Sequence, residues 1–148
     1  MQLRGIIGTR RAHNDMIFSR TITYAVQATV AIARNRPDHP VSASRLAKST
    51  SLPERFLPQI LRRLVNKGVL ISTKGVAGGY ALSRSPNEIT LFDIVDAIES
   101  PKEPAQFTLT GLSEAARERL RIQLIETSIA ACDSLKNLTV AELIESHS

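Results

Sequence analysis

Apolar positions recur every three or four residues in several separate stretches of this chain, which predicts a mainly helical fold. The first stretch predicts a helix over residues 22–33, and its apolar side is expected to contain Ile22, Ala25, Val26, Val30 and Ala33. Two prolines within residues 35–40 cannot extend that helix and predict a loop. A short helix over residues 43–48, with Ser42 as its N-cap, is expected next.

The next helix is expected to open near Pro53 and to run to Lys67, where Gly68 can take the left-handed cap conformation. At 100 degrees per residue its apolar side chains gather on one side. They are Leu57, Ile60, Leu61 and Leu64. Polar side chains gather on the opposite side: Arg55, Gln59, Arg62 and Asn66. This outward set suits a reader of the DNA major groove, although a plain amphipathic helix has the same period.

A β-hairpin is expected after this helix pair. Residues 69–73 are rich in β-branched side chains, residues 74–79 contain three glycines, and residues 80–83 resume the apolar pattern. Glycines permit a tight turn and a close approach of the hairpin tip to another surface. A phosphate-binding P-loop is the competing interpretation, but its GK[ST] ending is missing and no helix follows directly.

Two more helical regions follow, separated by a linker with prolines and a glycine. Thr90 and Asp93 have capping-box spacing and predict a helix over residues 91–99. A helix of about six turns is predicted over residues 114–135, and a last helix over residues 140–146. The long helix has an apolar seam at Ile122, Ile125, Ile129 and Cys132. This spacing suits pairing between two subunits, and the alternative is packing on the same chain.

The order of these elements is that of a winged helix, in which the second helix of a helix-turn-helix pair enters the major groove. The predicted fold class is therefore mainly α, with a winged helix-turn-helix domain, a two-stranded β wing and a long C-terminal dimerisation helix. We expect a disordered extension over residues 1–15, the winged domain over 16–100, a linker over 101–112 and the dimerisation region over 113–148.

The start of the chain also has features of a twin-arginine signal, because Arg10 and Arg11 precede the apolar stretch that ends at Ala33. Polar residues interrupt that stretch and make it amphipathic, which favours a core helix instead. No run of about 18 apolar residues occurs, so no membrane span is expected. Met16 is a second candidate translation start.

Positive charge is concentrated in one part of the 148-residue chain, whose net charge is +5. Residues 1–100 hold 14 Lys and Arg against 7 Asp and Glu, whereas residues 101–148 hold 5 against 7. Within residues 42–84 eight basic side chains accompany a single acidic one, Glu54. Such a segment attracts polyanions, of which nucleic acid is the commonest, and a solvated basic surface is the plainer explanation.

Cysteine and aromatic content exclude several classes of site. The single cysteine, Cys132, rules out a disulfide framework within the chain and any metal or iron–sulfur site that needs several thiolates. This usage fits a reducing cytoplasm. With no Trp and 4% aromatic residues, an RNA-binding sheet of stacked rings is not expected.

Four stretches together resemble the Rrf family of bacterial winged-helix regulators. They are residues 19–33 with Tyr24-Ala25, residues 52–70 (LPERFLPQILRRLVNKGVL), residues 74–82 (KGVAGGYAL) and residues 89–99 (ITLFDIVDAIE). The similarity is firm over residues 16–100 and weaker afterwards, although residues 138–143 resemble the family's closing helix.

The resemblance implies a homodimeric, promoter-binding regulator, usually a repressor, whose long C-terminal helix is the dimer element. It places Lys74 where the family often has a wing arginine for the minor groove, and Gln59 at a base-reading position. Pro58 stands where IscR-like members carry an acidic residue, which makes an identical operator doubtful. A proline so far into a helix also favours a late start or a bend.

The resemblance does not extend to the ligands of the iron–sulfur cluster through which some family members sense a signal. Family members with an iron–sulfur cluster present three cysteines in the linker after the fourth helix, and residues 100–112 here contain neither Cys nor His. Some relatives supply a carboxylate ligand where this chain has Thr23. No cofactor is therefore expected, and DNA binding should be regulated by a partner protein, a small molecule or thiol oxidation. Cys132 is a candidate redox switch, but a lone cysteine on an apolar seam is usually a small hydrophobic residue.

The leading hypothesis is a DNA-binding regulator. Its candidate DNA-contacting residues are Arg45, Lys48, Ser51, Arg55, Gln59, Arg62, Arg63, Lys67, Lys74 and Gly75. Its candidate partners are double-stranded DNA, a second copy of itself, and a protein or small-molecule effector. The alternative is a winged-helix protein interaction module with a scaffolding helix. An enzyme is not expected, because no nucleophile with a neighbouring base and no carboxylate pair has a recognisable spacing.

Overall fold

The computed structural model describes residues 19–35, 39–99 and 110–145. The expected extension over residues 1–15 and most of the expected linker over 101–112 lie outside these ranges. The elements follow the predicted order: α1 (Arg20–Ala33), α2 (Ala43–Thr50), α3 (Leu57–Asn66), β1 (Leu70–Thr73), β2 (Gly79–Leu82), η3 (Pro86–Glu88), α4 (Leu91–Ile98), α5 (Glu114–Lys136) and α6 (Val140–Glu145). The mainly helical winged fold is thus confirmed.

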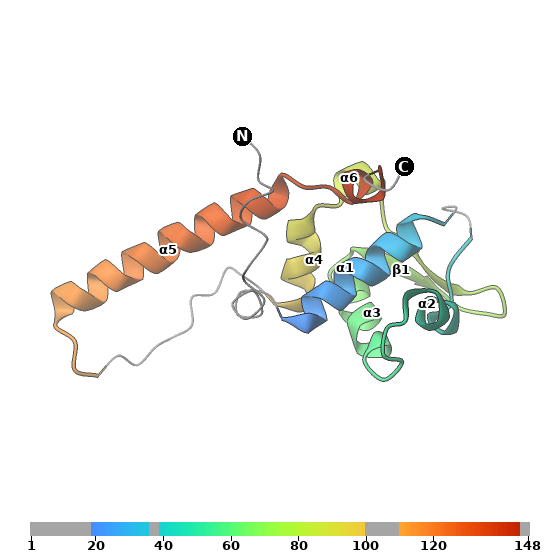
Figure 1. Cartoon of the computed structure of the whole chain (residues 1–148), viewed down its shortest axis with the longest axis horizontal. Coiled ribbons are helices and arrows are strands. Elements are labelled where there is room, and N and C mark those ends of the chain that lie inside the picture. The colour runs from blue at the N-terminus through green and yellow to red at the C-terminus, as the bar shows by residue number, and fades with distance from the viewer. Residues whose placement is uncertain (1–18, 36–38, 100–109, 146–148) are drawn as a thin grey trace, which may run out of the picture.

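Helix α1 crosses the middle of the domain and contacts α2, α3, α4, α6 and β2 (Figure 1). Its buried residues are Ile22, Ala25, Ala28, Thr29 and Ile32. The predicted apolar side was partly wrong, because Val26, Val30 and Ala33 are only half-buried. Small residues let the neighbouring helices approach, and buried Thr29 donates its hydroxyl to the Ala25 carbonyl at 2.8 Å, which satisfies the polar group.

Helix α2 begins as predicted and extends two residues further than predicted. The Ser42 hydroxyl accepts a hydrogen bond from the Arg45 backbone N–H at 3.2 Å, so the expected N-cap is confirmed. Ser49 and Thr50 do not break the helix, because their hydroxyls donate to the Leu46 carbonyl within it. The break comes at Ser51, which takes a left-handed conformation with φ 56°.

Helix α3 begins later than Pro53. Residues 53–56 form a turn, closed by the Phe56 N–H donating to the Pro53 carbonyl at 3.0 Å, and Pro58 falls in the first helical turn. The late start is therefore how the chain accommodates Pro58. At the other end Gly68, with φ 73°, donates to Val65, and Val69 donates to Leu64. These two bonds form a Schellman motif, which confirms the predicted glycine cap.

Strands β1 and β2 form the antiparallel wing, with Leu70 opposite Leu82 and Thr73 opposite Gly79. The base of the wing is tied to the segment before α2, because Val41 and Tyr80 exchange backbone hydrogen bonds of 2.9 Å. This pairing brings the two backbones so close that a Cβ added to Gly79 would lie 2.5 Å from the Val41 carbonyl. Glycine at this position is thus required by contact within the domain.

Helices α4 and α6 complete the domain, and α5 projects away from it (Figure 1). The Thr90 and Asp93 capping box opens α4 as predicted. Thr139 and Glu142 make the same contacts at the start of α6, and the hydrogen bonds from Thr139 hold the pKa of the Glu142 carboxyl below its usual value. Backbone bonds of 2.8 Å from Leu91 to Leu138 and from Val140 to Ile89 join α4 to α6.

The hydrophobic core lies where α1, α2, α3 and α4 meet. Leu46, Leu61, Leu64 and Ile94 are fully inaccessible to solvent there. In the part of the chain that the structure describes, no helix is both long enough and apolar enough to cross a bilayer.

We expect Gly79→Ala to lower the free energy of unfolding by about 1 to 3 kcal/mol, because the added methyl group must push the wing away from the Val41 backbone. Urea denaturation measures this change. Ser72→Ala, at an exposed position on β1, is the control and should change stability by less than about 0.5 kcal/mol. Equal stability of the two variants would contradict this explanation of Gly79.

Candidate nucleic-acid interface

The burial of α3 decides which of its side chains face solvent. Leu57, Ile60, Leu61 and Leu64 are buried against the core, as the helical period predicted. Gln59 and Arg62 are exposed on the other side, and Arg55 is exposed in the turn before the helix. A guanidinium can bond guanine N7 and O6, and a side-chain amide can bond adenine N6 and N7. The exposed side of α3 thus has the donors and acceptors of a base-reading surface.

The other predicted DNA contacts lie around α3. Arg45 and Lys48 are exposed on α2, Ser51 is exposed in the turn that follows, and Lys74 and Gly75 are exposed at the wing tip. None of the three basic side chains has an ion pair within the described residues. The helix pair and the wing therefore present positive charge that no acidic side chain of the described residues pairs, and such a surface attracts polyanions.

Two of the predicted phosphate contacts also have partners inside the domain. Arg63 donates through Nη1 to the Ile98 carbonyl at 3.1 Å, and the Lys67 ammonium lies 3.5 Å from Asp96. Both partners belong to α4, so the Arg63 and Lys67 side chains connect the C-terminal end of α3 to α4. Sequence periodicity did not indicate these bonds, because both partners lie about thirty residues further along the chain.

Two exposed apolar side chains at this surface were not among the predicted site residues. Phe56 is 40% exposed directly before α3, and the Arg55 guanidinium lies 4.6 Å from its ring centroid, a cation–π contact. Val76 at the wing tip is fully exposed. The sequence held a signal for both residues, because Phe56 follows the polar pair Glu54-Arg55 and Val76 lies in the glycine-rich wing tip, where an apolar side chain is expected to be exposed.

A groove of about 940 Å³ runs along the outer side of α1. Its apolar lining comes from Ile22, Val26, Val30, Leu91, Val95, Leu135 and Leu143. These residues belong to α1, to α4 and to the points where α5 and α6 meet the domain. The half-buried Val26 and Val30 thus line an uncovered apolar surface.

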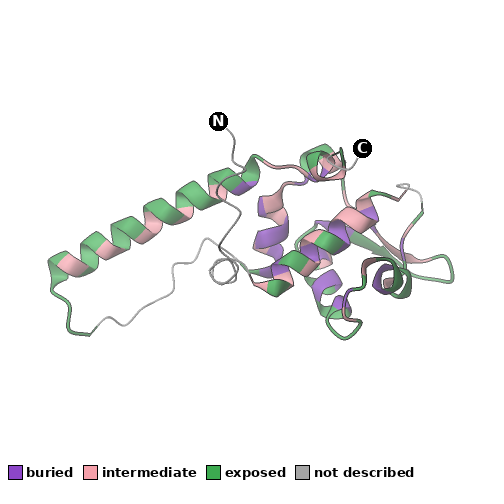
Figure 2. Cartoon of the chain, in the orientation of Figure 1, coloured by how far each residue is buried: buried purple, intermediate pink, exposed green. Residues whose placement is uncertain are grey.

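Most residues of helix α5 are exposed (Figure 2). Leu135 is its buried residue, whereas Ile122 is 44% and Ile129 is 56% exposed. Ile125 and Cys132 are half-buried, and Cys132 packs against the edge of the core as a small apolar side chain. Two of the four residues of the predicted seam, Ile122 and Ile129, are thus exposed large apolar side chains.

Comparison with known proteins gives the family. The model of the Rrf2 family, described as "Iron-dependent Transcriptional regulator", matches residues 18–146. The HTH-type transcriptional regulator CymR of Bacillus subtilis is 29% identical over 111 residues, which are 75% of this chain and 79% of that protein. A putative HTH-type transcriptional regulator of Aquifex aeolicus is 40% identical over 81 residues, and the chain spans only 56% of its length.

Solved structures give the same fold. The structure of CymR, described as the global cysteine regulator of B. subtilis, has a TM-score of 0.69 with 27% identity, and the match covers 88% of this chain and 98% of that one. The structure of T. potens IscR has a TM-score of 0.67 over 88% of both chains, at 24% identity.

The described residues contain no ligand set for the iron in the family description. A three-cysteine cluster cannot form, because Cys132 is the single cysteine and is half-buried on α5. Across residues 19–35, 39–99 and 110–145, no three His, Cys, Asp or Glu side chains are grouped to hold a metal ion. The residues present therefore do not fit an iron–sulfur cluster held by three cysteines, which is the kind that cluster-binding members of the family carry.

The family match, the relatives and the fold agree with the exposed cationic surface of α2, α3 and the wing. The chain belongs to the Rrf2 family and is a DNA-binding transcriptional regulator rather than an enzyme.

Proposed function

We propose that this protein is a homodimeric repressor that reads a pseudo-palindromic operator in the cytoplasm and works without an iron–sulfur cluster. One observation carries the proposal. The buried side of α3 leaves Gln59 and Arg62 exposed, Arg55 is exposed in the turn before the helix, and the basic residues of α2 and of the wing tip are exposed as well. A dimer presents two such surfaces to half-sites one helical turn apart, about 34 Å in duplex DNA.

Each basic group has a different role in this proposal. Arg55, Gln59 and Arg62 contact base edges in the major groove. Arg45, Lys48 and the Ser51 hydroxyl bond the phosphates beside the major groove. Arg63 and Lys67 bond phosphates too, through the N–H groups that do not donate to α4. Lys74 enters the minor groove, and Gly75 lets the wing backbone approach the duplex.

The exposed seam of α5 and the groove along α1 support the dimer. Ile122, Ile125, Ile129 and Cys132 provide apolar surface on α5, and the groove provides more on the domain itself. A projecting helix with exposed isoleucines loses solvent contact when a second copy packs on it, and that burial contributes about 25 cal/mol per Å². Both surfaces are covered in the proposed dimer.

The absence of a fitting ligand set supports control without a cluster. The sequence contains one cysteine, and the linker after α4 has neither Cys nor His. In this proposal the signal that releases DNA is a protein or a small molecule.

We expect DNA binding to weaken steeply with salt. If the dimer neutralises six or more phosphates, its affinity for an operator should fall at least about a thousandfold between 50 and 200 mM salt. Fluorescence anisotropy with duplexes selected from a random pool measures this slope. An affinity that does not change with salt would contradict the proposed phosphate contacts.

We expect Arg55→Ala and Gln59→Ala each to cost about 1 to 3 kcal/mol of binding and to relax selectivity at one base pair of the selected operator. Lys48→Ala should weaken selected and random duplexes alike. Arg117→Ala, an exposed arginine on α5, is the matched control and should bind as the wild type does. Unchanged selectivity in both the Arg55 and the Gln59 variant, together with loss of a protein complex, would favour the interaction-module alternative.

We expect Ile129→Glu to shift the protein from dimer to monomer, because a carboxylate on the seam cannot be buried without a partner. Sedimentation velocity measures the change. Thr127→Glu adds the same charge to another exposed side of α5 and should leave the dimer intact. A wild-type protein that sediments as a monomer at micromolar concentration would overturn the dimer.

A further inference from the structure

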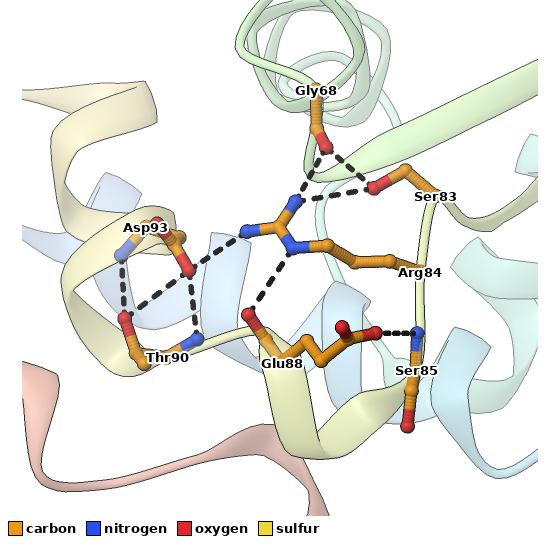
Figure 3. A network of polar contacts seen from close by, with 7 residues as sticks. All are labelled: Gly68, Ser83, Arg84, Ser85, Glu88, Thr90 and Asp93. Atoms are coloured by element: carbon orange, nitrogen blue, oxygen red, sulfur yellow. Dashed lines mark hydrogen bonds and ion pairs between the residues drawn. The ribbon is translucent and has the colours of Figure 1, made fainter.

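The Arg84 side chain is the centre of a polar network behind the wing (Figure 3). Its Nη1 donates to the Gly68 carbonyl at 2.9 Å, its Nε to the Glu88 carbonyl at 3.1 Å, and its Nη2 to the Asp93 carboxylate at 2.9 Å. The three nitrogens of one planar guanidinium thus donate to three different parts of the chain. The network was not foreseen from sequence, where Arg84 counted only as one more basic residue of residues 42–84.

Each partner of Arg84 marks the end of a different element. Gly68 follows α3 as its left-handed cap, Glu88 is the last residue of η3, and Asp93 lies in the first turn of α4. The Asp93 carboxylate is itself held, because it accepts hydrogen bonds from the Thr90 N–H at 2.9 Å and from the Thr90 hydroxyl at 3.2 Å. Arg84 therefore joins the exit of β2 to rigid points on α3 and α4.

The contacts at the base of the wing, where β1 begins and β2 ends, hold the hairpin in place relative to α3. A two-stranded hairpin is at best marginally stable alone, and in β1 only Leu70 is buried. Gly68 leads into β1 and Arg84 follows β2 after one residue, so the bonds from Arg84 and from the Ser83 hydroxyl to the Gly68 carbonyl close the hairpin at its base. These bonds hold the wing against the end of α3, and the Val41–Tyr80 pairing holds it against the segment before α2.

We propose that Arg84 is a positioning residue for DNA binding, which acts with Asp93 to hold the wing at the angle to α3 that lets Lys74 reach the duplex. This inference rests on the proposed function. In this role the guanidinium acts through its bonds inside the domain, where its Nε, Nη1 and Nη2 each donate a hydrogen bond to a group of the protein. Lysine cannot replace it, since a single ammonium lacks the planar fork that reaches three acceptors.

The test is a double-mutant cycle between Arg84→Gln and Lys74→Ala, measured as affinity for the selected operator, with thermal unfolding recorded for every variant. Arg84→Gln should weaken binding about tenfold in the wild-type background and less than about twofold in the Lys74→Ala background, because the wing contact is then already lost. A merely structural defect would lower affinity by the same factor in both backgrounds. Equal factors, or no effect of Arg84→Gln on wild-type affinity, would overturn the proposal.

A second variant keeps the test decisive if Arg84→Gln does not fold. Asp93→Asn retains an oxygen that can accept from Thr90 but loses the charge that faces Arg84, and the same dependence on the Lys74 background is expected of it. A wild-type protein without preference for any duplex would overturn the proposed function and this inference together. A selective wild-type protein whose Asp93→Asn loss is identical in both backgrounds would overturn the inference alone.

Discussion

The burial of one side of α3 is the constraint on which the rest of the surface depends. Four large aliphatic side chains of this ten-residue helix pack against α1 and α4, and each contributes about 1.5 to 3 kcal/mol relative to an exposed position. A helix held on one side by that much apolar contact cannot rotate about its axis. Gln59 and Arg62 face solvent for this reason, and the functional surface is a consequence of the core.

Helix α4 connects the parts of the molecule that recognition needs. It meets α3 through the Arg63 and Lys67 contacts, the wing through Asp93 and Arg84, and the start of α6 through the backbone bonds of Ile89 and Leu91. Surface ion pairs taken singly stabilise proteins little. Their effect here is geometric, because they tie the end of α3 and the base of the wing to one rigid element, α4.

Basic residues within one short segment of sequence thus have two kinds of role. Arg45, Lys48 and Lys74 have no ion pair in the described part of the chain, whereas Arg63 and Arg84 donate to backbone carbonyls of other elements. An arginine has five donors in a rigid fork, so it can connect segments that a lysine cannot. The count of positive charges therefore overstates how many are free for phosphates.

The sequence by itself determined the order of the elements and the two sides of α3, because hydrophobic period, proline, glycine and capping residues act over a few positions along the chain. It also determined that no three-cysteine cluster can form. Only the tertiary structure decided which side of α1 is buried, and that the exposed Arg84 bonds Gly68, Glu88 and Asp93. Such contacts join groups that lie far apart in sequence, such as Arg84 and Gly68, and they form only when the whole domain has packed.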